Sequence, residues 1–299
     1  MTALSLTQGV GYTKALILAM RPQQWTKNVL IFPALIFSER LMVWSESAKV
    51  LAACAVFCFL SSSIYLLNDL MDLENDRAHP VKCHRPLASG QLPVPVGIAT
   101  FVVLAVLSLL AGWLLSKPFF FVALVYFFLQ VAYSIRLKHI VILDVFCVAA
   151  GFVLRAIAGA EVLQVFISPW LLICAMLLSL FLALGKRRHE LLLLEEDAIA
   201  HRKILGEYSV DMLEQMISIV TASTLVCYAL YTISSETGLK HPNLKYTIPF
   251  ALYGIFRYLY LIHHKNQGGS PDKALLNDPS SLVNLILYGA VSGIILYLN

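Results

Sequence analysis

Long apolar stretches alternate with short polar segments along the whole chain. A helix needs about 20 predominantly apolar residues to cross a hydrocarbon core of roughly 30 Å. The pattern predicts an all-α membrane protein with nine transmembrane helices in one domain over residues 1–299. A shorter apolar run at 15–20 predicts an interfacial helix ahead of the first span. The predicted spans are 25–42, 48–68, 94–116, 118–135, 141–160, 165–185, 211–234, 246–264 and 281–298.

Composition agrees with this pattern. Hydrophobic residues make up 59% of the chain and charged residues 13%, with a mean hydropathy of +0.76. Soluble domains have roughly 45–50% apolar and about 25% charged residues, so a soluble globular protein is excluded. No nucleic-acid partner is expected, and the oligomeric state stays open.

The distribution of basic residues predicts an orientation. Most of the 22 Lys and Arg residues fall at the N-terminus and in alternate connections after it. Because Lys and Arg in short loops favour the cytoplasmic side, we expect a multi-pass protein of the cytoplasmic membrane with its N-terminus inside and its C-terminus outside. Polar clusters follow the second, fourth and sixth spans, so the active site is expected to face the cytoplasm.

One polar stretch, NDLMDLENDRAHPVKCHRPLASG at 68–90, carries candidate chemistry. If the helix of the second span continues through it, Asn68, Asp72 and Asp76 recur every four residues, and Asp69 lies within the same arc of about 100°. Four oxygen-bearing side chains on one face favour Mg²⁺, which keeps water ligands and binds substrate phosphates. A magnesium site with a diphosphate as its guest is therefore predicted.

The second half of the same stretch is basic. Lys82 and Arg85 follow the acids, and the planar donor fork of arginine matches phosphate oxygens. The simpler alternative is a solvated charged loop, which the regular spacing of the acids disfavours. A zinc site at His79, Cys83 and His84 is a weaker alternative, because this spacing matches no common ligand set.

The stretch 68–90 resembles the first aspartate-rich motif, NDxxDxxxD followed by a basic RPL-SG turn, of the UbiA superfamily of intramembrane prenyltransferases. The resemblance implies a UbiA-type bundle of nine helices with a cytoplasmic cap of inner loops. It further implies that Asn68, Asp72 and Asp76 hold Mg²⁺ on a diphosphate, with Asp69 beside them. Asp72 and Asp76 are then the catalytic residues, acting through the metal.

The segment LGKRRHEL after the sixth span departs from the aromatic prenyltransferases of that superfamily, which carry a second aspartate-rich motif there. With RPQQWTKN at 21–28 and YSIRLKHIVILDVFCVAAGFVLRAIAGA at 133–160, it resembles the branch of decaprenyl-phosphate phosphoribosyltransferases. That branch implies phosphoribosyl diphosphate as donor, a polyprenyl monophosphate lipid as acceptor, Mg²⁺ as cofactor, and a role in cell wall biogenesis.

The same resemblance supplies further candidate substrate contacts. Lys27 is expected near the lipid phosphate at the membrane surface, where the alternative is a simple interfacial anchor. Asp144 lies near the cytoplasmic end of its span, and Glu190 is expected to orient cations or a ribose hydroxyl. Arg155, eleven residues after Asp144, is about 16 Å from it along a helix, so a structural role is expected. The expected contacts to the donor are Lys82, Arg85, Lys186, Arg187 and Arg188, and Tyr133, Arg136 and Lys138 are expected to close either substrate site.

Two other functions stay open. An aromatic prenyltransferase would move a polyprenyl group from its diphosphate to an acceptor such as 4-hydroxybenzoate, and the missing second acid cluster counts against it. A non-catalytic transporter or lipid-binding protein would use the same acids as an ion site. Transporter sites lie near the bilayer midplane, whereas the polar residues here gather at span ends. The length of the acceptor lipid is not encoded in any motif that we identify.

Overall fold

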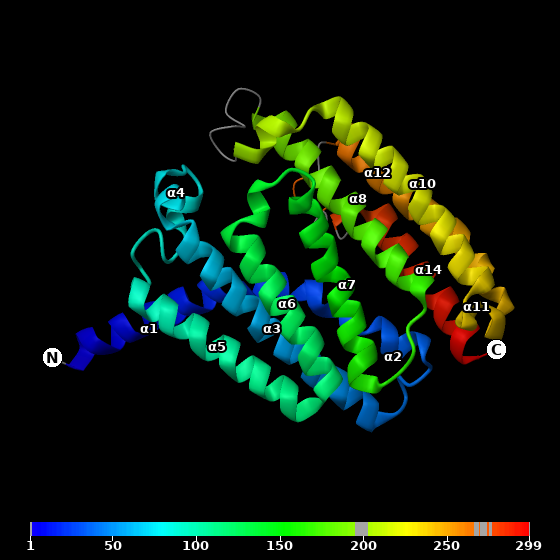
Figure 1. Ribbon diagram of the computed structural model, residues 1–299, viewed down its shortest axis with the longest axis horizontal. Helices are drawn as coiled ribbons and strands as arrows, with labels where there is room; N and C mark the ends of the chain where they lie inside the picture. Colours follow the sequence, from blue (N-terminus) through cyan, green and yellow to red (C-terminus); the bar gives the residue numbers. More distant parts are fainter. Residues whose placement is uncertain (1, 195–202, 266–268, 270–273, 275–276, 299) are drawn as a thin grey trace. The chain divides into compact units, whose positions relative to one another are not determined.

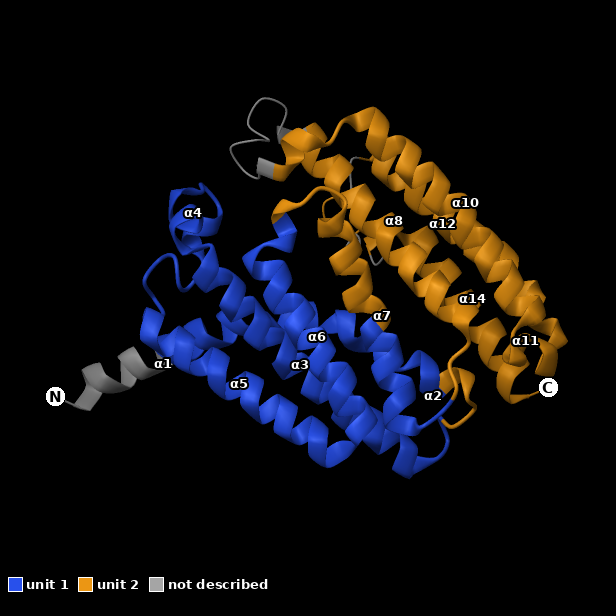
Figure 2. Ribbon diagram, in the orientation of Figure 1, with its two compact units in different colours: residues 1–35, 41–138, 154–165 blue, residues 36–40, 139–153, 166–299 orange. Residues whose placement is uncertain are grey.

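The computed structural model describes residues 2–194, 203–265, 269, 274 and 277–298, without the side chains of 2–10, 193, 194 and 203. These residues form α-helices and 3₁₀-helices, and no strand occurs among them. Figure 1 shows the order of the helices along the chain. Two compact units share the chain: residues 1–35, 41–138 and 154–165 form unit 1, and residues 36–40, 139–153 and 166–299 form unit 2 (Figure 2). The single domain over 1–299 stays a prediction.

Unit 1 is built around one long central helix. In Figure 1 the helices α5 and α6 run beside α3, and the 3₁₀ segment η1 also packs on α3. A small apolar cluster joins α1 to α3 and to the loop that follows α4, through Ala15, Ala19, Leu66, Leu87 and Leu92. The elements of unit 1 that precede α7 are α1 (Thr2–Met20), η1 (Pro22–Ile31), α3 (Trp44–Met71), α4 (Leu73–Ala78), η2 (Lys82–His84), α5 (Val94–Leu115), α6 (Lys117–Ile135) and η3 (Leu137–His139), whose last residue already belongs to unit 2.

Unit 2 is a second helical bundle in which α8 packs along α10, and α12 packs along α14. Its main core contains Leu184, Leu213 and Tyr258, all nearly inaccessible to solvent. The helix α7 (Leu143–Leu163) begins in unit 2 and ends in unit 1, whereas α2 (Pro33–Phe37) begins in unit 1 and ends in unit 2. The other elements are α8 (Pro169–Leu194), η5 (Lys203–Glu207), α10 (Val210–Ser234), α11 (Glu236–Lys240), η6 (Pro242–Thr247), α12 (Ile248–His264) and α14 (Pro279–Tyr297).

Seven helices of the described residues are long and apolar enough to cross a membrane, so the protein is a multi-pass membrane protein. The predicted count of nine is not confirmed. The first predicted span, 25–42, falls on η1 and the five-residue helix α2, which begins at Pro33. Pro33 lacks the N–H that a helix continuing through it would use. The eighth, 246–264, contains α12, which at 17 residues is about 25 Å long. The short apolar run at 15–20 lies within α1, as expected for a helix ahead of the first span.

The chain before α3 is held to unit 1 by buried polar contacts. Arg155 donates from Nε to Asn28 Oδ1 at 2.8 Å and from a terminal nitrogen to the Tyr126 hydroxyl at 2.9 Å. Trp25 donates from its indole to the hydroxyl of Ser62 at 3.0 Å. The expected structural role of Arg155 is thereby confirmed, since it ties η1 to α6 and α7.

Candidate functional site

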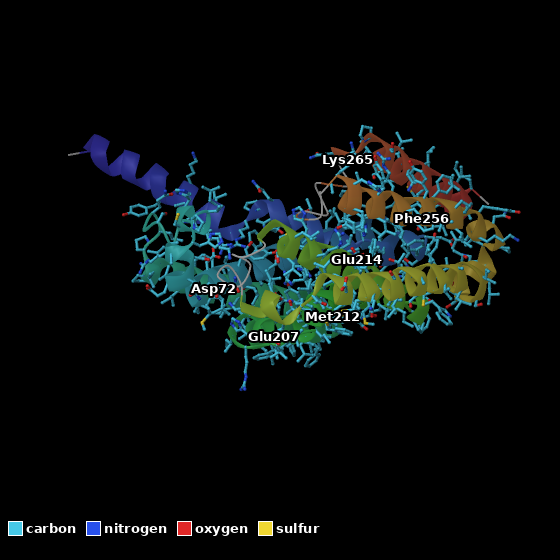
Figure 3. All side chains as sticks on the ribbon, turned by 90° about the horizontal axis from the view of Figure 1, so that it is seen from above. Asp72, Glu207, Met212, Glu214, Phe256 and Lys265 are labelled. Carbon is cyan, nitrogen blue, oxygen red and sulfur yellow. The ribbon has the colours of Figure 1, made fainter. Side chains whose placement is uncertain are left out.

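The aspartate-rich stretch lies at a helix junction. The helix α3 ends at Met71, and α4 begins at Leu73, so Asp72 forms the joint (labelled in Figure 3). Backbone hydrogen bonds still connect Asp72 N–H to Asn68 carbonyl at 3.0 Å and Asp76 N–H to Asp72 carbonyl at 2.8 Å. The predicted continuous helix is therefore interrupted at Asp72, although the four-residue hydrogen-bond spacing persists across the break.

Asn68 and Asp72 converge on one cation. Lys138 Nζ lies 2.6 Å from Asp72 Oδ1 and 3.4 Å from Asn68 Oδ1. The lysine side chain is about one-tenth exposed, so its charge is largely shielded from water and strengthened toward these oxygens. Lys138 thus joins η3, which follows α6, to the junction of α3 and α4.

Asp69 and Asp76 form a second pair with a different cation. Arg85 Nη1 lies 3.1 Å from Asp69 Oδ1 and 2.6 Å from Asp76 Oδ2. Both carboxylates are almost fully buried, at 2% and 3% exposure. Arg21 also donates to Asp69 Oδ1, and its guanidinium lies 5.2 Å from the ring centroid of Tyr65.

The four oxygen-bearing residues are therefore contacted as two pairs, each by a different cation. Within the described part of the chain, no group of three or more His, Cys, Asp or Glu side chains could hold a metal ion without other ligands. This arrangement is compatible with Mg²⁺, which keeps several waters and binds one or two carboxylates together with substrate phosphates. The zinc alternative at His79, Cys83 and His84 has no such group to support it among the same residues.

The segment between the acids and Arg85 is ordered by a histidine. His79 Nδ1 accepts hydrogen bonds from Val81 N–H at 3.1 Å and Lys82 N–H at 3.2 Å. A ring nitrogen that accepts two hydrogen bonds is unprotonated, so the ring carries its proton on Nε2. This contact fixes the backbone at Lys82, one of the predicted cations.

In unit 2, a group of charged residues predicted to contact the donor lies next to Asp144. Arg187 Nε donates to Asp144 Oδ2 at 2.8 Å, and its Nη1 donates to Glu190 Oε2 at 2.7 Å. Lys186 lies 3.7 Å from the other oxygen of Glu190. Asp144 is fully buried and Arg187 is 5% exposed, whereas about half of the Lys186 side chain is exposed. The helix α8 thus has one cation buried among carboxylates and another available to solvent.

Arg188, also on α8, has a different partner, which lies on α10. Its Nε donates to Glu214 Oε1 on α10 (labelled in Figure 3), and the other oxygen of Glu214 lies 3.1 Å from His263 Nε2. His263 Nδ1 lies 2.8 Å from the Leu259 carbonyl. Both ring nitrogens of His263 thus lie within hydrogen-bond distance of an oxygen atom. This group ties α8, α10 and α12 together.

Three residues predicted to contact a substrate do not take part in the hydrogen bonds and ion pairs described above. Lys27 lies in η1 and is half-buried, Tyr133 lies half-buried on α6, and Arg136 is exposed at the end of that helix. Each stays a prediction.

The sequence analysis did not identify two residues that contact predicted site residues in the structure. Arg21 stands in the stretch RPQQWTKN, and its position directly before Pro22 was the available signal. Tyr208 donates its hydroxyl to Asp144 Oδ1 at 2.7 Å, and nothing in its sequence surroundings indicates this. Burial, and then the bond to Asp144, raise the pKa of Tyr208, so its hydroxyl keeps its proton and stays a donor.

Comparison with known proteins relates the chain to one family. The sequence profile of the UbiA prenyltransferase family matches residues 29–277. A decaprenyl-phosphate phosphoribosyltransferase from Mycolicibacterium smegmatis is 39% identical over 225 residues, covering 74% of this chain and 71% of that protein. A second one, from Corynebacterium glutamicum, is 35% identical over 275 residues, covering 88% of this chain and 81% of that protein.

A solved structure supports the fold independently. A UbiA homolog from Archaeoglobus fulgidus, bound to GPP and Mg²⁺, has a TM-score of 0.70 to this chain at 18% identity. The match covers 94% of this chain and 96% of that one. At this level of identity the likeness shows the fold alone, and the predicted UbiA-type helical fold is confirmed.

Proposed function

The chain belongs to the UbiA prenyltransferase family, and on this premise we propose that it transfers a 5-phosphoribosyl group from phosphoribosyl diphosphate to a polyprenyl monophosphate, releasing diphosphate. The names of the relatives at 35–39% identity support this reaction. The observation that carries it is the pairing of Asn68 and Asp72 around Lys138, and of Asp69 and Asp76 around Arg85. Metal-binding oxygens and phosphate-binding cations are thereby interleaved, as a metal–diphosphate donor requires.

The reaction is a displacement at the anomeric carbon. A phosphate oxygen of the lipid attacks C1 of the ribose, the bond from C1 to the diphosphate oxygen breaks, and diphosphate leaves with the electron pair. A phosphate monoester is already ionised near neutral pH, so the attack needs no dedicated general base. Direct displacement would invert the configuration at C1. The protein therefore contributes chiefly by orienting the substrates and by stabilising the charge on the leaving group.

Magnesium fits the donor set at the junction of α3 and α4. Asn68 Oδ1 and Asp72 Oδ1 both approach the same ammonium nitrogen, so they converge on a position that suits a positive charge. We assign the metal to Asn68, Asp69, Asp72 and Asp76, with Asn68 and Asp72 nearest to that position. When bound, Mg²⁺ would neutralise part of the diphosphate charge and ease departure of the leaving group.

The cations of both units are assigned to phosphate groups. Arg85 and Lys138 already lie among the acids of the predicted metal site, and Lys82 follows in the same loop, so these three are assigned to the donor diphosphate. In unit 2 the exposed Lys186 is assigned a direct contact to a donor phosphate, and Arg187, Arg188 and Glu190 are assigned to the charged group around Lys186. Lys27 is assigned to the lipid phosphate, and Tyr133, Arg136 and Asp144 to the surroundings of the substrates.

Replacing His79 tests the assignment of Lys82. Asparagine places its amide oxygen where the histidine carries Nδ1, and this side chain readily accepts from the backbone N–H two residues on. We expect His79→Asn to retain the KM for phosphoribosyl diphosphate within about twofold. His79→Gln, which places its oxygen near the Nε2 position, should raise that KM about fivefold, on the order of 1 kcal/mol of lost binding. Equal KM values for the two variants would contradict the role of Nδ1.

The proposed setting is the cytoplasmic membrane, with the N-terminus inside, the C-terminus outside and the site facing the cytoplasm. The basic residues that follow alternate spans support this orientation. Single cysteines placed in the loop that contains Lys82 and in the connection near Lys240 should differ in labelling by an impermeant thiol reagent added to sealed cells. The first should react only after the cells are opened, and the reverse pattern would invert the topology.

The proposed activity is tested with purified protein, Mg²⁺ and a polyprenyl phosphate. Label from phosphoribosyl diphosphate should move into the lipid phase, and omission of Mg²⁺ should stop the transfer. The aromatic prenyltransferase alternative is tested in parallel with a polyprenyl diphosphate and 4-hydroxybenzoate. Product in the second assay without product in the first would retain the family and overturn the proposed donor.

A further inference from the structure

The backbone just before α7 contains a strained turn. Leu143 N–H donates to the Val141 carbonyl at 2.8 Å across a single residue, Ile142, whose φ is 70°. A hydrogen bond of this span defines a γ-turn, and the form with positive φ is the rarer and more strained one. A β-branched residue is especially disfavoured in this region of φ. Something in unit 2 must hold Ile142 in this conformation.

Tyr208 supplies that restraint. Its hydroxyl accepts a hydrogen bond from Ile142 N–H at 2.8 Å and donates one to Asp144 Oδ1 at 2.7 Å. One oxygen atom thus holds the strained residue and the carboxylate two positions after it. Tyr208 is buried at 5% exposure, so water does not readily replace either bond.

The same contacts continue from Asp144 toward the solvent. Asp144 Oδ2 accepts from Arg187, Arg187 donates to Glu190, and Glu190 pairs with Lys186. The series begins at a fully buried carboxylate and ends at a lysine that is about half exposed. Movement of Asp144 would therefore change the position of the charged groups at the accessible end.

We propose that Tyr208 is a positioning residue: its hydroxyl holds the strained turn at Ile142 and, through Asp144 and Arg187, sets the positions of Lys186 and Glu190 for binding the phosphoribosyl donor. The statement about donor binding rests on the proposed function. The statement about the turn concerns the fold of unit 2 alone. Tyr208 touches no reacting atom in this scheme and is not a catalytic residue.

The kinetic test removes the hydroxyl with Tyr208→Phe. We expect the KM for phosphoribosyl diphosphate to rise about tenfold while kcat changes less than threefold, because orientation of the binding cations is lost and the chemical step is not. Tyr228→Phe is the matched control, since it also removes a hydroxyl with two partners, those of Thr247 and Tyr288, in the same unit. Equal KM values in the two variants would overturn the proposal.

A second substitution isolates the strain. Glycine adopts positive φ without steric cost, so Ile142→Gly in the Tyr208→Phe protein should lower the KM part of the way toward the wild-type value, since the turn is relieved while the bond to Asp144 is still missing. If the double variant is as impaired as Tyr208→Phe, the hydroxyl does not act through the turn and the proposal fails.

A stability comparison keeps the inference testable even if Tyr208→Phe does not fold or no phosphoribosyl transfer is found. Ile142→Gly and Ile142→Ala both remove the isoleucine side chain, but alanine keeps the Cβ that opposes positive φ. The glycine variant should melt at a higher temperature than the alanine variant in the same detergent. This order is the reverse of the usual one, in which an alanine variant is more stable than a glycine variant. A higher melting temperature for alanine would overturn the strained turn without bearing on the reaction.

Discussion

Asp72→Asn should lower phosphoribosyl transfer by about a hundredfold to a thousandfold, the scale of losing one preorganised electrostatic contact in an active site. The substitution keeps the shape of the side chain and an oxygen that Lys138 can bind, but it removes the negative charge at the junction of α3 and α4. Lys138 Nζ lies 2.6 Å from Asp72 Oδ1, so one of the two oxygens that converge on this position loses its charge. Titration of purified protein with Mn²⁺, followed by electron paramagnetic resonance, should show weaker binding alongside the lost activity.

Glu74→Gln is the matched control for this experiment. Glu74 stands two residues away in the same stretch, its side chain is 83% exposed, and it pairs with Arg77 across the surface of α4. Exposed pairs of this kind contribute roughly 0–1 kcal/mol, so activity and Mn²⁺ affinity should stay near the wild-type values. If Asp72→Asn and Glu74→Gln behave alike in both measurements, the assignment of Asp72 to the metal is wrong.

Gly159→Ala should destabilise the folded protein by about 3 kcal/mol, the upper part of the range for inserting an atom into a packed interior. A Cβ atom at residue 159 would lie 1.9 Å from the backbone oxygen of Ile31 and 2.8 Å from its carbonyl carbon. Ile31 is fully buried and belongs to η1, so the backbone itself would have to move. Small residues that allow close backbone approach are a common device in membrane helix packing. A fall in melting temperature in detergent, with reduced recovery of folded protein, is the expected observation.

Gly293→Ala provides the comparison within the same chain. Gly293 lies inside α14, and a Cβ atom there would meet nothing within 4 Å. Alanine is favoured over glycine in a helix by about 1 kcal/mol, so this variant should be unchanged or slightly more stable. Equal stability of the two variants would show that η1 does not pack on α7 as closely as described.

The membrane class and much of the helical pattern followed from the sequence, because apolar runs of sufficient length have no other stable arrangement in lipid. The predicted stretches 48–68, 94–116 and 118–135 correspond to α3, α5 and α6. Hydropathy alone did not predict the loss of the first span. Residues 25–42 form part of a 3₁₀ segment and a short helix that begins at Pro33, and this break is not visible in hydropathy.

The candidate site was predicted as a set of residues, and its internal order was not. The spacing of Asn68, Asp69, Asp72 and Asp76 identified them as a group, because residues three or four positions apart on a helix project their side chains close together. It could not show that Arg85 and Lys138 each contact a different pair of these residues, since Arg85 lies in a loop and Lys138 lies in η3.

The sequence by itself determined the membrane class and located the acidic stretch and the basic segment after the sixth span, because each is a property of residues that are neighbours along the chain. Only the tertiary structure decided that Arg21 meets Asp69 and that Tyr208 holds both Ile142 and Asp144. These partners are 48 to 66 residues apart. Contacts over such separations depend on how helices pack, and packing is set by many side chains together, so no short motif records it.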